Sequence, residues 1–204
     1  MKEQEIEVKF FLGQASDMSG RLQAAGAELA IARVFEQNLR FDLPDGRLSQ
    51  SRQVLRLRRD TQNIITYKGA GENSDGALSR RELEVRVDDF EAARQILEAL
   101  GYRVMFIYEK YRTTYHWDDL EVVLDELPYG FFCEIEGPNG EAIHAAAEKL
   151  GLDWEKRITA SYADLFKRLQ AARNLKIRDL TFADFEGIAF QAKDLGIRVG
   201  LVQS

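Results

Sequence analysis

The stretch Glu5-Ile6-Glu7-Val8-Lys9-Phe10 alternates charged and apolar side chains from one position to the next. In an extended strand, successive side chains point to opposite faces, so this segment would have one charged face and one apolar face. A solvated outer strand would show the same alternation. The stretch alone therefore indicates a surface strand and a functional site equally well, and the recurrence of its pattern along the chain decides between them.

The same alternation returns in later segments. Residues 54–58 read Val-Leu-Arg-Leu-Arg, which places two leucines on one face of a strand and two arginines on the other. Residues 80–87 place four charged side chains, among them Glu82 and Glu84, on a single face. We expect further strands within residues 31–43, 64–68, 106–117, 121–127 and 131–136. Most of these strands would have one charged and one apolar face.

Three of the charged strands carry a Glu-x-Glu motif, and each leads into a turn, an amphipathic segment and a stopping glycine. The motifs are Glu5-x-Glu7, Glu82-x-Glu84 and Glu134-x-Glu136, and the glycines are Gly26, Gly101 and Gly151. We interpret the series as an internal repetition of a strand-then-helix unit. Coincidence remains the alternative, because glutamate is common in this chain.

Apolar stripes at helical spacing predict helices between and after the strands. We expect a short first helix that runs through residues 22–25, and further helices over residues 88–100, 140–150, 159–173 and 181–195. Ser16 or Asp17 would cap the first of them. The apolar face of the last helix needs a partner, either the main domain or a second subunit. Residues 69–79 contain three glycines and predict a flexible loop, a candidate lid over whatever the strands bind.

Charged faces on so many strands admit two arrangements. The faces could simply be solvated, or the strands could close into an antiparallel barrel with charged side chains inward and apolar side chains outward. The second arrangement explains the amphipathic helices, which need an apolar sheet surface to cover. We therefore predict an α+β fold, an eight-stranded antiparallel closed β-barrel or tunnel with helices packed outside. Residues 1–168 would form the tunnel domain and residues 169–204 a C-terminal helical extension.

Composition narrows the class of protein. The 204 residues give a net charge of −6, which argues against a general nucleic-acid binder. The sequence has neither an apolar run long enough for a membrane span nor a signal peptide at its start, which predicts a cytoplasmic protein without membrane contact. The single cysteine, Cys133, is expected to be a buried small hydrophobe. His116 and His144 are too few and too far apart to indicate a histidine metal site.

The lumen of such a barrel would be highly charged. Its acids would be Glu5, Glu7, Asp125, Glu134 and Glu136, and its bases Lys9, Arg56, Arg58, Lys68, Lys110 and Arg112. Burying these charges uncompensated costs too much, so water, ions or a polyanion must fill the lumen. Clustered carboxylates without Cys or His suit a hard cation such as Mg²⁺ or Mn²⁺, and neighbouring Arg and Lys suit phosphate oxygens. The set predicts a metal and polyphosphate site.

In the order of its motifs, the chain resembles the CYTH family of class IV adenylate cyclases and thiamine or inorganic triphosphatases. Residues 5–9 resemble the family signature Glu-x-Glu-x-Lys. The later matches are Leu-Arg-Leu-Arg at 55–58, Thr-Tyr-Lys-Gly at 66–69, Arg-x-Glu-x-Glu at 80–84, Glu-Lys-Tyr-Arg at 109–112, Asp-Glu-Leu at 125–127 and Phe-Cys-Glu-Ile-Glu-Gly at 132–137. The resemblance covers about residues 1–168 and implies an eight-stranded antiparallel tunnel.

The resemblance also implies roles for individual residues. Triphosphate would be bound by Lys9, Arg56, Arg58, Lys68, Lys110 and Arg112, by one of Arg80 and Arg81, and by Arg157 as a late contact. One or two Mg²⁺ or Mn²⁺ ions would be held by Glu5, Glu7, Asp125, Glu134 and Glu136. Glu82 and Glu84 would line the same face with open roles. Lys68 is the catalytic candidate, although a bound water or the substrate itself could equally manage the proton.

Two departures from the family bear on the reaction. Thiamine-selective members have an aromatic residue where Val54 stands, and hydrolytic members often have a water-activating tyrosine where Arg40 stands. The sequence therefore favours a class IV adenylate-cyclase-like enzyme that converts ATP to cyclic AMP and pyrophosphate. Hydrolysis of ATP, tripolyphosphate or thiamine triphosphate is the alternative, and a non-catalytic polyphosphate or nucleotide sensor is the third. The oligomeric state, including a homodimer, stays open.

Overall fold

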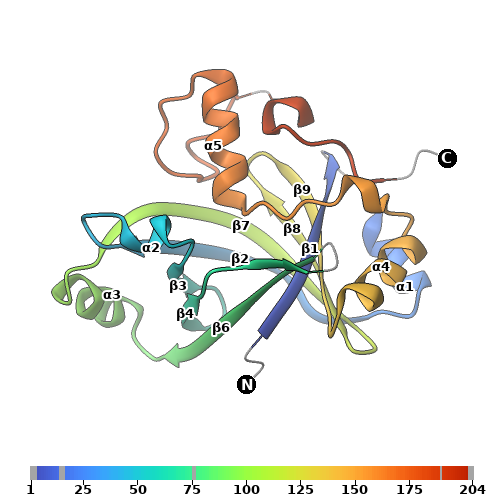
Figure 1. The fold of residues 1–204 in the computed structure, drawn as a ribbon, viewed down its shortest axis with the longest axis horizontal. Helices are drawn as coiled ribbons and strands as arrows, with labels where there is room; N and C mark the ends of the chain where they lie inside the picture. The colour runs from blue at the N-terminus through green and yellow to red at the C-terminus, as the bar shows by residue number, and fades with distance from the viewer. Residues whose placement is uncertain (1–3, 14–16, 75–76, 189, 202–204) are drawn as a thin grey trace.

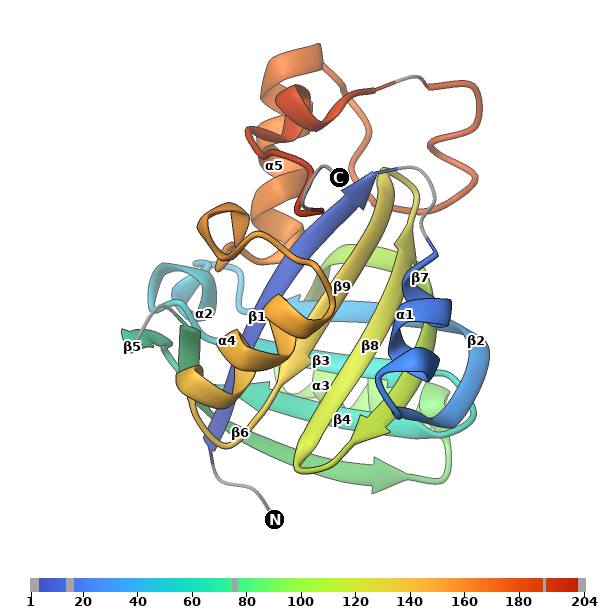
Figure 2. The ribbon, with the colours of Figure 1, turned by 90° about the vertical axis from the view of Figure 1, so that its right-hand side faces the viewer.

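The strands form a single sheet that closes on itself. The computed structural model describes residues 4–13, 17–74, 77–188 and 190–201. Within these residues, nine strands follow the order β1-β9-β8-β7-β2-β3-β4-β6-β5, and every strand pairing is antiparallel. Pairing of β1 with β6 closes eight strands into a ring, with β5 attached to β6 outside it (Figures 1 and 2). The predicted eight-stranded antiparallel tunnel is confirmed.

The strands follow the predicted alternation closely. They are β1 (Gln4–Gly13), β2 (Glu28–Asp42), β3 (Val54–Arg59), β4 (Asn63–Lys68), β5 (Glu72–Ser74), β6 (Ala77–Val87), β7 (Arg103–Trp117), β8 (Leu120–Leu127) and β9 (Gly130–Glu136). On β1, Val8 and Phe10 are fully buried in an apolar cluster on the outer face, while Glu7 and Lys9 face inward. Alternation at a period of two therefore sorts the charges into the lumen.

Helices cover the outer face, as the amphipathic stripes predicted (Figure 1). They are α1 (Met18–Ala24), α2 (Arg47–Gln50), α3 (Phe90–Ala99), α4 (Gly140–Lys149) and α5 (Tyr162–Arg173), with 3₁₀ turns η1 (Trp154–Lys156) and η2 (Ala192–Leu195). The side chains of Asp89, Asn139 and Ser161 accept hydrogen bonds from the first turns of α3, α4 and α5. These caps satisfy backbone N–H groups that would otherwise lack partners.

Three apolar clusters lie between the sheet and its coverings. The first packs α1 and α4 on the outer face of β1, β8 and β9, and it contains the fully buried Cys133 (Figure 2). The second packs α3 against β2 and β3. The third packs α5 and the C-terminal segment against one end of the tunnel, with Leu165, Leu180 and Leu195 fully buried. The expectation of a buried cysteine is therefore confirmed.

The C-terminal segment also pairs with strand edges that the ring leaves open. Leu180 bridges β7, where its amide donates to the carbonyl of Ile107 at 2.8 Å. Val199 bridges Phe11 of β1, and the amide of Gly200 donates to the carbonyl of Phe11 at 2.7 Å. Such edges would otherwise expose unpaired backbone groups. The segment after α5 is thus built into the tunnel at two strands.

Two predicted elements are wrong. Residues 181–195 do not form one helix, because Gly187 adopts a left-handed φ of 77° that ends a turn begun by Thr181 and Asp184. Only η2 is helical in this stretch. The predicted loop at 69–79 contains β5 and the start of β6, which pair with each other, while residues 75–76 lie outside the described part.

The predicted domain boundary after residue 168 falls inside α5. In the described part of the chain, no helix is long and apolar enough to cross a membrane.

Candidate active site

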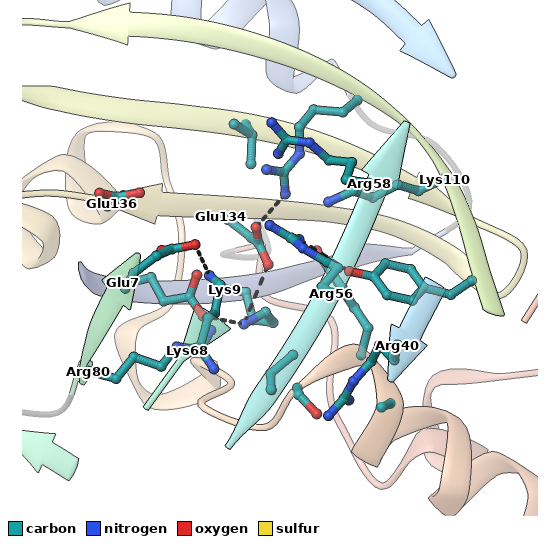
Figure 3. Close-up of a pocket in the computed structure, with 18 of the residues that line it drawn as sticks. Glu7, Lys9, Arg40, Arg56, Arg58, Lys68, Arg80, Lys110, Glu134 and Glu136 are labelled. Atoms are coloured by element: carbon teal, nitrogen blue, oxygen red, sulfur yellow. Dashed lines mark hydrogen bonds and ion pairs between the residues drawn. The ribbon is translucent and has the colours of Figure 1, made fainter. Parts of the chain in front are cut away.

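A charged cavity of about 190 Å³ lies inside the ring of strands (Figure 3). Its lining residues are Glu7, Lys9, Arg40, Val54, Arg56, Arg58, Lys68, Arg80, Glu82, Glu84, Tyr108, Lys110, Arg112, Glu121, Val123, Glu134, Glu136, Ser161, Tyr162 and Ala163. Of these twenty residues, eight are basic and six are acidic. A cavity with this lining suits a polyanion together with a cation.

The basic side chains come from six strands that converge on the cavity. The structure brings together the predicted Lys9 of β1, Arg56 and Arg58 of β3, Lys68 of β4, Arg80 of β6, and Lys110 and Arg112 of β7, and it adds Arg40 of β2. Arg56 shows how they are held, because its guanidinium donates to Thr66 Oγ1 at 3.1 Å and to the Tyr108 hydroxyl at 3.3 Å. Among the described residues its buried Nε has no hydrogen-bond partner. A buried donor without a partner indicates room for a ligand acceptor.

The carboxylates lie mainly on β1, β8 and β9. In the strand registers, Glu136 lies directly opposite both Glu7 and Glu121, and Glu134 lies opposite Lys9. Like charges in directly opposed cross-strand positions destabilise a sheet, so this row favours a cation between its members. Glu121 was not predicted as a site residue, although its alternation with Asp125 along β8 was visible in the sequence.

The donor set fits a hard divalent ion. Glu7, Glu134 and Glu136 supply carboxylate oxygens from the inner faces of neighbouring strands, and the lining contains neither Cys nor His. Within the described residues, no three acidic, histidine or cysteine side chains form a ready metal cluster. Mg²⁺ usually binds one or two carboxylates and takes its other ligands from water and substrate phosphate. The side chain of Glu5 lies outside the described residues, so its predicted metal role stays a prediction.

Asp125 occupies a different position from the other predicted metal ligands. Its side chain is fully buried beneath the cavity. Its Oδ1 accepts from Arg112 Nε at 2.7 Å, and its Oδ2 accepts from Arg112 Nη2 at 2.6 Å, Lys110 Nζ at 3.0 Å and the Tyr162 hydroxyl at 2.9 Å. Oδ2 therefore accepts from three donors and Oδ1 from one. In this arrangement Asp125 holds the cations of Lys110 and Arg112, and its predicted metal role stays a prediction.

Glu36 and Asn38 form a second buried layer that the sequence did not reveal. Glu36 Oε1 lies 3.4 Å from Lys110 Nζ and accepts from Asn38 Nδ2 at 2.8 Å. Burial raises the pKa of the Glu36 carboxyl, but the positive charges of Lys110 and Arg112 outweigh this effect and lower the pKa to about 2. The polar Gln37 between them obscures the strand alternation, so residues 31–43 looked like a mainly apolar strand.

The acidic and basic groups shift each other's pKa values as their distances imply. Arg112 Nη2 lies 2.7 Å from Glu134 Oε2, and Lys9 Nζ lies 3.4 Å from Glu134 Oε1. Burial raises the pKa of Glu134, but Lys9 and Arg112 lower it well below its usual range. Glu134 is therefore ionised at neutral pH. Burial lowers the pKa of Arg40, which faces the cavity beside α5 (Figure 3).

The structure separates some predicted site residues from the cavity. Arg81 is exposed on the outer face of β6, whereas Arg80 points inward and donates to Glu7 Oε1 at 3.2 Å. The side chain of Arg157 packs over the ring of Trp154 and is not among the lining residues.

Glu82 and Glu84 do line the cavity. Glu82 Oε1 lies 3.1 Å from Lys68 Nζ and Glu84 Oε1 lies 3.5 Å from Arg56 Nη2, so both acids hold cations of the site.

Fold and site together define an antiparallel tunnel protein whose closed lumen carries converging basic and acidic side chains. The chain belongs to the CYTH domain family, whose model matches residues 3–179. This match confirms the resemblance that the motifs carried, and it extends past the end of the region that the motifs covered.

Individual relatives support this family assignment. A Methanocaldococcus jannaschii protein, provisionally named an adenylate cyclase, is 28% identical over 134 residues, covering 65% of this chain and 75% of that protein. A Vibrio parahaemolyticus structure with a similar provisional name has a TM-score of 0.73 at 20% identity and covers 82% of this chain and 99% of its own. A Hippeastrum structure, described as an adenylyl cyclase candidate with dominant triphosphatase activity, has a TM-score of 0.60 at 18% identity, covering 80% and 95%.

Proposed function

We propose that the protein is a Mg²⁺- or Mn²⁺-dependent enzyme that converts ATP to cyclic AMP and pyrophosphate. The observation that carries this proposal is the convergence of eight basic side chains on one closed cavity, facing carboxylates on β1 and β9. Charge-assisted hydrogen bonds from Arg and Lys match the oxygens of a triphosphate chain. The charged lumen therefore supports a triphosphate as the substrate group.

The reaction would be carried mainly by positioning and by charge stabilisation, as in other phosphoryl-type chemistry. The ribose 3′ hydroxyl attacks the α-phosphorus and gives up its proton to water or to a substrate phosphate, the bond from that phosphorus to the oxygen that bridges to the β-phosphorus breaks, and pyrophosphate leaves with that oxygen. Arg56, Arg112 and Lys9 would hold the phosphate oxygens in line for this displacement. Lys68, held 3.1 Å from Glu82, would donate to the departing pyrophosphate.

Glu7, Glu134 and Glu136 would hold the divalent ion. When bound, such an ion neutralises the charge that develops on the phosphate oxygens. The eight strands enclose the reacting groups, which strengthens every electrostatic contact by limiting access of water.

Hydrolysis of a triphosphate is the second candidate, and the polar lining of the cavity favours it. The wall offers only Val54, Val123, Tyr108, Tyr162 and Ala163 as apolar or aromatic contacts for a nucleoside. Of the two tyrosines in the wall, Tyr108 contacts Arg56 and Tyr162 contacts Asp125. Arg40 occupies the position at which hydrolytic relatives often have a water-activating tyrosine. The presence of Arg40 in place of that tyrosine supports cyclisation over hydrolysis.

Product analysis tests the proposal. The purified protein is incubated separately with ATP, tripolyphosphate and thiamine triphosphate, each with Mg²⁺ and with Mn²⁺, and the products are separated by ion-exchange chromatography. Cyclic AMP with stoichiometric pyrophosphate supports the cyclase. Orthophosphate as the main product would replace it with the hydrolase.

A protein that turns over none of these substrates but gains thermal stability from them would be a sensor. Ligands that bind only the folded state raise the melting temperature. No turnover and no shift with millimolar tripolyphosphate and Mn²⁺ would count against the whole assignment.

A further inference from the structure

Tyr162 lies against the phosphate-binding groups, although no motif in the sequence assigns it a role. It is the first residue of α5, and its side chain is buried in the cavity wall. Its aromatic ring packs edge-on against Phe132 of β9, with centroids 5.1 Å apart and planes at 75°. The Tyr129 hydroxyl donates to its backbone carbonyl at 2.9 Å. The packing against Phe132 fixes the position of the side chain, and the hydrogen bond from Tyr129 holds the backbone at the start of α5.

The hydroxyl of Tyr162 completes the coordination of Asp125. It donates to Oδ2 at 2.9 Å, the same oxygen that receives Lys110 and Arg112. Because the carboxylate is fully buried, it depends on donors of the protein for its hydrogen bonds. Removing the hydroxyl would take away one of the three donors to Oδ2, and Lys110 and Arg112 would be free to shift.

The aromatic ring of Tyr162 contacts two cations of the site at once. Lys9 Nζ lies 5.5 Å and Lys110 Nζ lies 5.6 Å from its centroid, within the range of cation–π attraction. These lysines come from β1 and β7, which are separated in the sheet by β9 and β8. Tyr162 therefore links basic groups on strands that do not touch each other.

We propose that Tyr162 is a positioning residue that, with Asp125, holds Lys9, Lys110 and Arg112 in the arrangement that binds triphosphate. Through it, the packing of α5 is coupled to the affinity of the cavity. The inference rests on the proposed function to the extent that triphosphate is taken as the anion.

A second buried tyrosine supplies a matched control. Tyr129 belongs to the same apolar cluster as Tyr162 and packs edge-on against the same Phe132, with centroids 5.7 Å apart. Its hydroxyl donates to the backbone carbonyl of Tyr162 and not to a charged group of the site, so Tyr129→Phe removes a hydrogen bond from the same cluster without removing a donor to Asp125. A role in stability alone predicts similar behaviour for both tyrosines, whereas positioning of the cations predicts a difference.

The test measures binding of inorganic tripolyphosphate by calorimetry with EDTA present, so that metal plays no part. We expect Tyr162→Phe to weaken binding by about tenfold, the factor of a hydrogen bond to a charged group. Tyr129→Phe should change it by less than about twofold. Tyr162→Leu, which also removes the aromatic face, should weaken binding further than Tyr162→Phe.

A double-mutant cycle with Asp125→Asn tests whether the two residues act as a unit. If they do, Tyr162→Phe has little further effect in the Asp125→Asn background. Circular dichroism identifies variants that fail to fold, and if Asp125→Asn fails, the comparison of the three tyrosine variants decides alone.

Two failures are distinguishable. If the wild-type protein does not bind tripolyphosphate, the proposed function fails. If the wild type binds and Tyr162→Phe binds equally well, or no worse than Tyr129→Phe, the inference about Tyr162 is overturned while the proposed function stands.

Discussion

At the scale of single residues, two acids of the cavity each contact two cations. Glu134 contacts both Arg112 and Lys9, and Glu7 contacts both Lys9 and Arg80. When one partner of a buried charge is removed, the charges that remain are less well compensated for their desolvation. Removing one charge from this network should therefore change the chemistry of the site more than the fold.

Replacing Glu134 by Gln should separate metal use from anion binding. The change keeps the size of the side chain but removes a proposed ligand of the divalent ion, so metal-dependent turnover should fall by at least about tenfold. Binding of tripolyphosphate without metal should stay the same or strengthen, because a negative charge has been removed. Rates across a Mn²⁺ titration and calorimetry measure the two effects.

Glu98→Gln on the exposed side of α3 is the control for Glu134→Gln and should leave both quantities unchanged. Metal-dependent turnover that survived Glu134→Gln at wild-type level would refute the metal role of Glu134.

The depressed pKa of Glu36 predicts acid sensitivity. Its ordinary pKa is 4.5 and its value in the folded protein is about 2, so the unfolded state binds protons first as pH falls. The contribution of Glu36 to stability is therefore complete above pH 4.5 and is lost between pH 4.5 and about 2. Urea unfolding at a series of pH values should show stability declining through this window. In Glu36→Gln the decline should be smaller, and equal slopes in both proteins would contradict the assignment.

An inward-facing residue could be predicted from the sequence only where charged and apolar residues alternate clearly around it. Arg56 stands between two leucines and Arg58 follows the second of them, so their face was evident. Glu36 and Asn38 flank the polar Gln37, which hid which face was buried. Tyr162 could not be predicted as a neighbour of Asp125 because the contact joins α5 to β8, and no local pattern sets the distance between them.

At the scale of elements, β6 shows how alternation along a strand places neighbouring residues on opposite sides of the tunnel wall. Arg80, Glu82 and Glu84 face the cavity, and Arg81 and Leu83 face outward. The motif alone left open which arginine reaches the lumen. Alternation with the two glutamates settles the choice.

The two arginines of β6 give a matched pair of variants. Arg80→Ala removes an inward guanidinium and should weaken tripolyphosphate binding by about 10- to 100-fold. Arg81→Ala removes the same side chain from the outer face and should leave binding unchanged. Calorimetry on both proteins checks this, and equal losses in the two variants would show that β6 is oriented differently.

The helix expected over residues 88–100 begins at Phe90 after its cap Asp89, whereas the helix expected from residue 159 begins only at Tyr162, after the cap Ser161. Residues 181–195 do not form the expected helix, because their phenylalanines pack against different surfaces. Phe185 enters the cluster under α5, while Phe182 packs on Tyr111 with centroids 5.2 Å apart. Spacing alone shows that apolar residues need burial, but it does not show that they are buried against one partner.

At the scale of the whole molecule, the C-terminal segment belongs to the same apolar cluster as the tunnel end. Leu180, Phe185 and Leu195 pack with Phe11 of β1 and Phe132 of β9. We propose that residues 169–204 act as a structural part of the tunnel domain rather than as an independent unit. The motifs could not reveal this, because they end before the segment begins.

Shortening one buried leucine in this segment should destabilise the whole protein. Leu195→Ala leaves a cavity in the cluster and should lower the free energy of unfolding by about 2–5 kcal/mol. Leu100→Ala, at a leucine that is 68% exposed on α3, should change it by less than about 0.5 kcal/mol. Denaturant unfolding followed by fluorescence measures both. A Leu195→Ala protein as stable as the wild type would show that the segment is separable.

The buried Cys133 has a practical consequence for measuring motion of the tunnel wall. It is the only thiol in the chain, it lies under α1 and α4 on the outer face of β9, and burial raises its pKa well above the usual range. A thiol reagent can modify it only after the wall opens, because the thiolate is the reactive form. The rate of labelling in native buffer therefore reports how often this side of the tunnel opens. Triphosphate that bridges β1, β3 and β7 should slow that rate.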